Sequence, residues 1–119
     1  MKKIEQQICE AFNAAIHNVG GGSKLSESDR VAHHLIFKSD YYYHHDSCIF
    51  WYNHKQQRFG FSLRGYNTVT TRSRLRALLD YFCDSDLYMK QGKVYLEQDG
   101  KKHEVDANGI YFIERRINL

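Results

Sequence analysis

Residue types that bind metals or activate nucleophiles gather in the middle of the chain. They form two adjacent histidine pairs with two neighbours, namely His33-His34, His44-His45, Asp46 and Cys48. A zinc site needs several such ligands that converge on one point, usually at short and regular spacings. Adjacent residues of a strand point to opposite faces of a sheet, so each histidine pair would give only one ligand to a site. We therefore expect no metal site and no cofactor.

The same residues could also serve covalent catalysis, with Cys48 as the nucleophile and His44 or His45 as its base. Such a pair needs a third group to orient the base, for which Asp46 is the candidate, and donors that stabilise the developing negative charge. The sequence shows no recognisable set of such donors, and a cysteine that opens an aromatic strand is usually a small core residue. We expect no catalytic residues and a protein that is not an enzyme.

Aromatic residues are dense on both sides of the second histidine pair. The two runs are Tyr41-Tyr42-Tyr43 and Phe50-Trp51-Tyr52. One face of a sheet takes only alternate residues of a strand, so half of these rings must emerge on the other face. Tyr and Trp are enriched at interface hot spots, and both also stack on unpaired bases. We predict a partner-binding surface that includes Tyr41, Tyr42, Tyr43, Trp51 and Tyr52. Cover by a helix or by a second subunit, and hence a homodimer, is the alternative.

Residues 58–63, with the sequence Arg-Phe-Gly-Phe-Ser-Leu, resemble the base-stacking strand of the RNA-recognition motif. Residues 49–53 resemble its partner strand. In that fold the partner strand comes first, and a helix and another strand lie between the two. Here only a few residues separate them. We therefore interpret Phe59 and Phe61 as core residues.

After residue 64 the apolar pattern changes from the period of a strand to the spacing of a helix face. The helical positions are Leu75, Leu78, Leu79 and Phe82. Thr70 or Thr71 can cap this helix by accepting a hydrogen bond from one of its first free backbone N–H groups. The sequence thus predicts a strand, a hydroxyl-rich turn and a helix at about residues 71–82 as one unit.

The start of this helix is basic. Arg72 and Arg76 lie one turn apart and point away from the apolar face. The amino terminus of a helix favours anions, and Arg72 and Arg74 would strengthen that preference. We predict a site for a phosphate or a carboxylate at residues 70–74. Pairing of Arg76 with Asp80 on a solvated helix face is the alternative.

Residues 65–78 resemble a motif of small bacteriophage-encoded proteins of uncharacterised function. In those proteins a strand ends in Gly-Trp-x-Thr-x-Thr-Thr-Lys/Arg-x-Arg-Leu-Asn-x-Leu. The matching residues here are Gly65, Thr68, Thr70, Thr71, Arg72, Arg74, Leu75 and Leu78. Tyr66 stands where Trp is usual, and Arg76 stands where Asn is usual.

The resemblance implies a phage or prophage accessory gene. Small phage proteins without catalytic motifs often bind and block host machinery, including CRISPR and other defence complexes. The resemblance therefore implies an inhibitor of a host defence complex that acts by protein–protein contact in the host cytoplasm. We expect the contact residues to be the aromatic residues named above together with Tyr66, Arg72, Arg74 and Arg76. A phage accessory protein that binds nucleic acid is the alternative.

The rest of the pattern predicts an α+β fold with a mostly antiparallel sheet. Apolar residues at positions 4, 8, 12 and 16 predict an amphipathic helix at residues 3–17, which a triple glycine at residues 20–22 ends. Strands are expected at residues 31–38, 48–54 and 58–64. The last two pair as a hairpin through residues 55–57.

The C-terminal third reads as a β-meander after a break at residues 84–86. Its expected turns are Gln91-Gly92, Asp99-Gly100 and Asn108-Gly109, because Gly after a polar residue favours the positive φ angles of a tight hairpin. Both helices are expected to pack on one face of the sheet.

The bulk composition fits a small folded protein. With 119 residues, of which 42% are hydrophobic, the chain is expected to fold as one domain over residues 1–119. The net charge of +3 excludes an acidic mimic of DNA and permits contact with phosphates or acidic proteins. The three cysteines form no CxxC pair, which indicates reduced thiols. Since no apolar run approaches a membrane span or a signal peptide, we expect a cytoplasmic protein without a membrane partner.

Overall fold

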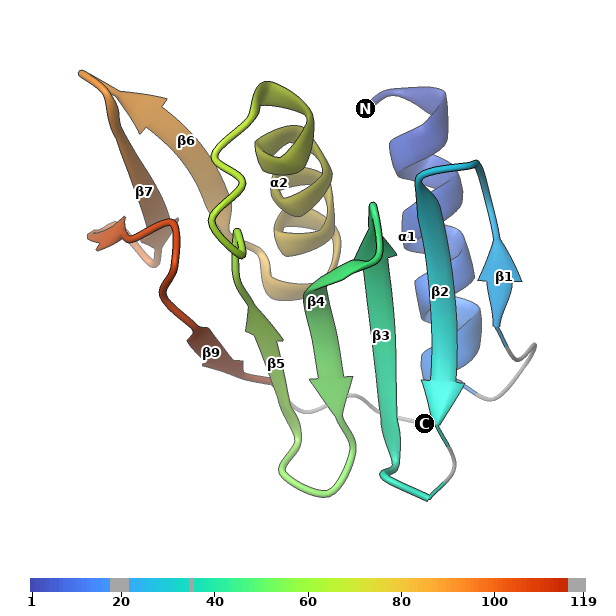
Figure 1. Ribbon diagram of the computed structural model, residues 1–119. Coiled ribbons are helices and arrows are strands. Elements are labelled where there is room, and N and C mark those ends of the chain that lie inside the picture. The colour runs from blue at the N-terminus through green and yellow to red at the C-terminus, as the bar shows by residue number, and fades with distance from the viewer. Residues whose placement is uncertain (18–21, 35, 116–119) are drawn as a thin grey trace.

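The computed structural model describes residues 1–17, 22–34 and 36–115 (Figure 1). These residues form two helices, α1 (Lys3–Ile16) and α2 (Val69–Cys83). They also form nine strands, which are β1 (Ser23–Lys24), β2 (Asp29–His34), β3 (Ser39–His44), β4 (Ser47–Asn53), β5 (Arg58–Phe61), β6 (Asp86–Lys90), β7 (Lys93–Gln98), β8 (Lys101–Val105) and β9 (Tyr111–Glu114). Neither described helix is long and apolar enough to cross a membrane.

All paired strands are antiparallel, which confirms the α+β class. The strands divide into a six-stranded sheet in the order β1-β2-β3-β4-β5-β9 and a three-stranded sheet in the order β6-β7-β8. The expected meander is present in β6, β7 and β8. The turn at Asn108-Gly109 is not a hairpin, because β9 crosses to the larger sheet and pairs with β5.

Both helices pack on the same side of the six-stranded sheet, as expected (Figure 1). α1 contacts β2 and β3, α2 contacts β4, and the helices contact each other. We call the opposite side of this sheet the outer face. No helix in the described part of the chain covers it (Figure 1).

The core lies between the helices and the larger sheet. Phe12 on α1 packs edge-on against Phe50 on β4 and Phe82 on α2, with ring centroids 5.1 and 5.3 Å apart. The apolar face predicted for α2 is fully or nearly fully buried, and so are Phe59 and Phe61 on β5. The interpretation of these two phenylalanines as core residues is confirmed.

The strand expected at residues 31–38 is wrong in its second half. β2 ends at His34, and a turn with a positive φ of 49° at Lys38 leads into β3. Ile36 and Phe37 in this turn are exposed, whereas residue 35 lies outside the described residues, as does most of the triple glycine. The expected hairpin is confirmed, since Asn53 on β4 pairs with Arg58 on β5.

The cap of α2 lies earlier than predicted. The Thr68 Oγ1 atom accepts a hydrogen bond from the Thr71 backbone N–H at 3.1 Å, and the helix begins at Val69. The expectation of a cap at Thr70 or Thr71 is therefore wrong. Thr71 is instead a buried residue of the first turn.

Candidate binding surface on the outer face

A row of residues in register crosses the outer face of the six-stranded sheet. Tyr41 on β3 pairs with Trp51 on β4, which pairs with Gly60 on β5, which pairs with Phe112 on β9. Their sequence neighbours Tyr42, Phe50 and Phe59 are buried on the helix side, because side chains alternate between the faces of a sheet. Three rings therefore lie on the side without helices.

Glycine at position 60 allows the Trp51 side chain to lie over the sheet. A Cβ atom added at Gly60 would lie 2.2 to 2.4 Å from three atoms of the indole ring, a separation that no side chain tolerates. The indole thus covers the backbone of β5 at Gly60, where the absence of a side chain leaves room for the ring. Phe112 meets its edge, with ring centroids 6.3 Å apart.

Three guanidinium groups accompany the rings. Arg30 lies 3.8 Å from the centroid of the Tyr43 ring, and Arg58 lies 3.8 Å from that of Phe112. Arg64 lies farther from Trp51, at 5.2 Å, and its Nε atom donates a hydrogen bond to the Cys48 carbonyl oxygen at 2.8 Å. A cation over a ring is attracted by the negative ring face. The outer face therefore combines aromatic side chains with positively charged guanidinium groups that lie over them.

Negative charge on the same face is sparse. Glu114 pairs in register with Arg58 and therefore shares its face. Asp46 lies 3.9 Å from Arg30, with its side chain 95% exposed in the turn after β3. The strand positions of this face thus carry a net positive charge.

Two of the aromatic residues predicted for the surface lie in the core. Tyr42 is 0% exposed and Tyr52 is 2% exposed. The Tyr42 hydroxyl donates a hydrogen bond to the Asp29 carboxylate, and burial, followed by that carboxylate, raises the pKa of the Tyr42 hydroxyl. Both residues point to the helix side because the strand alternates, so neither offers a contact to a partner of the folded chain. Tyr41, Tyr43 and Trp51 remain in the surface.

The predicted arginines lie away from the outer face, on the helix side. The Arg72 guanidinium donates to the backbone and side-chain oxygens of Asn67. Arg76 pairs with Asp86 at 2.9 Å, and not with Asp80 as the alternative reading had it. Tyr66 is 57% exposed in the loop before α2. The structure therefore does not bring the aromatic and basic parts of the predicted interface together.

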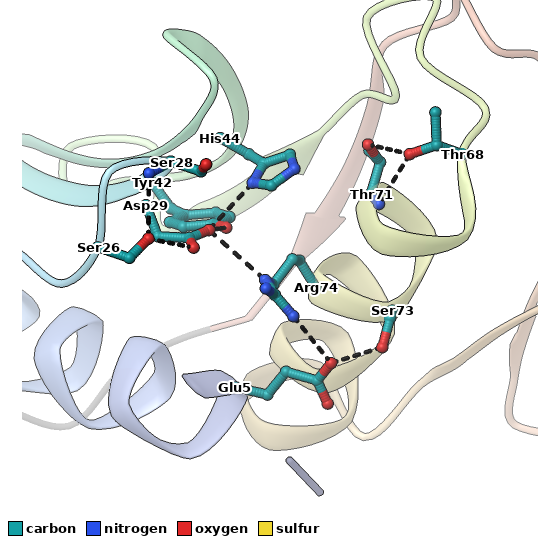
Figure 2. Close-up of polar contacts among 10 residues, drawn as sticks. All are labelled: Glu5, Ser26, Ser28, Asp29, Tyr42, His44, Thr68, Thr71, Ser73 and Arg74. Carbon is teal, nitrogen blue, oxygen red and sulfur yellow. Dashed lines mark hydrogen bonds and ion pairs between the residues drawn. The ribbon is translucent and has the colours of Figure 1, made fainter. Parts of the chain in front are cut away.

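Arg74 belongs to a buried polar network that sequence reasoning missed (Figure 2). Its guanidinium lies between two carboxylates, 3.3 Å from Glu5 Oε2 and 3.5 Å from Asp29 Oδ1. Ser73 Oγ also donates to Glu5, at 2.5 Å. The carboxylates come from α1 and β2, far from Arg74 in the sequence, so no local spacing could have indicated the contacts. Arg74 is a structural residue here, with a side chain only 13% exposed.

Asp29 is the centre of this network. It accepts hydrogen bonds from Ser26 Oγ at 2.8 Å and from Tyr42, and it contacts His44 Nδ1 at 3.0 Å (Figure 2). Burial raises the pKa of the Asp29 carboxyl, but these hydrogen bonds and the charge of Arg74 lower it by more, so that the net pKa lies below 3.8.

Three histidines, His33, His44 and His54, contact carboxylates. Asp40 is 0% exposed, and its two oxygens contact His33 Nδ1 at 2.5 Å and His54 Nε2 at 2.6 Å. Within the described residues, no group of three or more His, Cys, Asp or Glu side chains is arranged to hold a metal ion. His54 was not part of any sequence-based candidate site.

Cys48 is poorly suited to nucleophilic attack. Its thiol contacts the Phe50 carbonyl oxygen at 3.6 Å, and burial raises its pKa to about 11. Because the thiolate is the reactive form, little of it exists at neutral pH.

Comparison with known proteins gives the family. A family model described as Kyanoviridae Gp96 protein matches residues 1–117. Searches of curated proteins and of solved structures found no match. The phage origin that residues 65–78 implied is confirmed, whereas a role against host defence stays a prediction. Since the match covers nearly the whole chain, this small phage protein belongs to the Kyanoviridae Gp96 family.

Proposed function

We propose that this phage protein inhibits a host defence complex by binding to it, with CRISPR effectors as the first class to test. The outer face of the six-stranded sheet is its binding surface, and host cytoplasm is where it acts. The observation that carries the proposal is the row of rings flanked by three arginines on a sheet face without helices.

The residue types of the outer face support binding to a macromolecule. Trp, Tyr and Arg are the side chains most enriched among interface hot spots. Tyr41, Tyr43 and Trp51 are each only partly buried in the free protein, so they can lose further exposed area to a partner. A broad sheet face suits a large partner better than a small molecule, which binds in a concave pocket.

The buried titratable groups support binding in preference to catalysis. The carboxylates of Asp29 and Asp40 are 3% and 0% exposed, and their oxygens are occupied by protein donors. The Cys48 thiol has a raised pKa. A substrate would reach neither carboxylate without opening the fold.

The proposal is tested by measuring inhibition of purified defence nucleases at increasing concentrations of this protein. For the complex that is inhibited, Trp51→Ala and Tyr43→Ala should each raise the inhibitory concentration about tenfold or more, as hot-spot truncations do. Tyr95→Ala is the matched control, since Tyr95 lies on the separate three-stranded sheet. Circular dichroism of each variant checks that the fold is retained.

Two results would contradict the proposal. One is that no defence nuclease is slowed by the wild-type protein. The other is that Trp51→Ala and Tyr43→Ala inhibit as well as the wild type does, which would move the binding surface elsewhere on the molecule.

A further inference from the structure

We infer that the partner seated on the outer face is an unpaired nucleic-acid strand. The inference rests on the proposed function, in which this strand is the single-stranded RNA or DNA carried by the defence complex. The orientation of the rings, their spacing across the sheet and the charge around them support it.

The orientation of Trp51 suits stacking on a base. The indole covers the position that a Gly60 side chain would fill, so one side of the ring is taken up by the sheet and the other is directed away from it. Arg64 stands 5.2 Å from the ring centroid, whereas the other two arginines stand 3.8 Å from their rings. Of the three rings with an arginine over them, Trp51 is therefore the one whose guanidinium group lies farthest away, so that a base can stack on it with the smallest displacement of an arginine. Base stacking on aromatic side chains needs an accessible ring face and tolerates any sequence.

The spacing of the rings suits a short stretch of strand. Tyr41, Trp51 and Phe112 occupy one row that crosses β3, β4, β5 and β9. With neighbouring strands about 4.8 Å apart, the row extends about 14 Å. This length accommodates about two or three stacked bases, the number that open antiparallel sheets of RNA-binding domains receive.

The charge of the face favours a polyanion over a protein. Arg30, Arg58 and Arg64 flank the row, and arginine binds phosphate oxygens through paired N–H donors. Ala32 on β2, the register partner of Tyr41, adds only a small side chain next to the row. A phosphodiester strand supplies both the bases for the rings and the anions for the guanidinium groups.

The chain provides its own probe for this inference, because Trp51 is its single tryptophan. The full-length protein is titrated with single-stranded oligo-dT or oligo-U of about 12 nucleotides. Either strand should quench the Trp51 fluorescence as a base stacks on the indole. A duplex of the same length should quench it much less, because its bases are already stacked. If about three phosphates are neutralised, affinity should fall about 20-fold between about 50 and 200 mM salt.

Variants separate the contributions of rings and charges. With a labelled oligonucleotide and anisotropy as the readout, Trp51→Ala should weaken binding at least about fivefold at either salt concentration. Arg58→Ala should lower the slope of log affinity against log salt by about one third, because one of about three phosphate contacts is lost. Lys101→Ala is the control, as it removes one cation from β8 in the other sheet.

The possible results distinguish this inference from the proposed function. If neither single strand quenches Trp51 or changes anisotropy, while Trp51→Ala still loses inhibition, the face binds a protein component and the inference is overturned. If sedimentation shows that the protein alone dimerises and that Trp51→Ala abolishes the dimer, a second copy covers the face, which also overturns it. If single strands bind as predicted but no defence nuclease is inhibited, the inference stands and the proposed function fails.

Discussion

At the scale of single residues, two buried carboxylates provide hydrogen-bond partners for polar side chains on the helix side of the sheet. The Tyr42 hydroxyl would be unsatisfied in the core without an acceptor, and Asp29 supplies it. The two carboxylate oxygens of Asp40 contact His33 on β2 and His54 in the turn after β4. Of the histidines that were candidates for chemistry, His33 and His44 are therefore used to pair with buried carboxylates inside the fold, whereas Asp46 stays exposed.

The Asp29 network makes stability depend on pH in the acid range. The native pKa of Asp29 lies below its ordinary value of 3.8, so between the two values the unfolded state binds more protons than the native state. The free energy of unfolding should therefore keep this contribution above about pH 5 and lose it as the pH falls through the native pKa. Urea unfolding at a series of pH values from neutral to acid measures the effect.

Asp29→Asn is the variant for this measurement. It should be less stable than the wild type at pH 7, because Arg74 and the donors around position 29 lose their charged partner. Its stability should also decline less steeply in acid. Equal acid slopes for the two proteins would show that Asp29 does not carry the pH dependence.

At the scale of elements, the start of α2 shows how the surrounding chain decides which of several suitable residues caps a helix. Thr68, Thr70 and Thr71 are all suitable capping residues. The chain leaves β5 through positive φ angles at Arg64 and Gly65, 53° and 82°, and then places Thr68 in the extended conformation with φ −102° and ψ 159° that a cap requires. Thr70 is left exposed within the first turn. The geometry of the preceding turn, rather than the residue type, selects the cap.

The two threonines should respond differently to truncation. Thr68→Ala removes the acceptor for the Thr71 N–H and should lower the free energy of unfolding by about 1 kcal/mol. Thr70→Ala is the matched control and should change it by less than about 0.5 kcal/mol, as surface substitutions do. Chemical denaturation of both variants gives the comparison, and a larger loss in Thr70→Ala would restore the cap expected from the sequence.

At the scale of the whole molecule, the division between a covered and an open sheet face decides which rings can bind. Phe12 links α1 to the sheet and to α2 through Phe50 and Phe82. Phe112 lies on the opposite side of the same sheet and is 49% exposed. Phe12 thus contributes to the core on one side of the sheet, and Phe112 contributes to the exposed surface on the other.

Truncation of these two residues should separate stability from binding. Phe12→Ala leaves a cavity among three elements and should lower the free energy of unfolding by about 3–5 kcal/mol, a large part of the total of a small domain. Phe112→Ala should lower it by less than about 1 kcal/mol, because that ring is half exposed. Thermal and urea unfolding measure both, and equal losses would contradict the assignment of Phe112 to a surface.

The sequence by itself determined what depends on neighbours along the chain. The faces of both helices follow from the apolar period, and the hairpin turns at Gln91-Gly92 and Asp99-Gly100 follow from residue type, with positive φ at all four positions. The alternation in β4 also follows from the period of two, whereas β3 (Ser39–His44) lies outside the strands expected from the sequence. Each of these features is set within a few residues, where the backbone geometry is fixed.

Tertiary structure alone decided the rest. The period of two separates Tyr41 and Tyr43 from Tyr42, but only the packing of α1 and α2 selects the face that becomes core. Arg74 resembles its neighbouring arginines in sequence, yet its side chain is only 13% exposed because it meets Glu5, 69 residues away. Likewise β9 leaves the meander to pair with β5. Pairings between distant segments depend on the register and on the burial gained across the whole fold, and no local spacing encodes them.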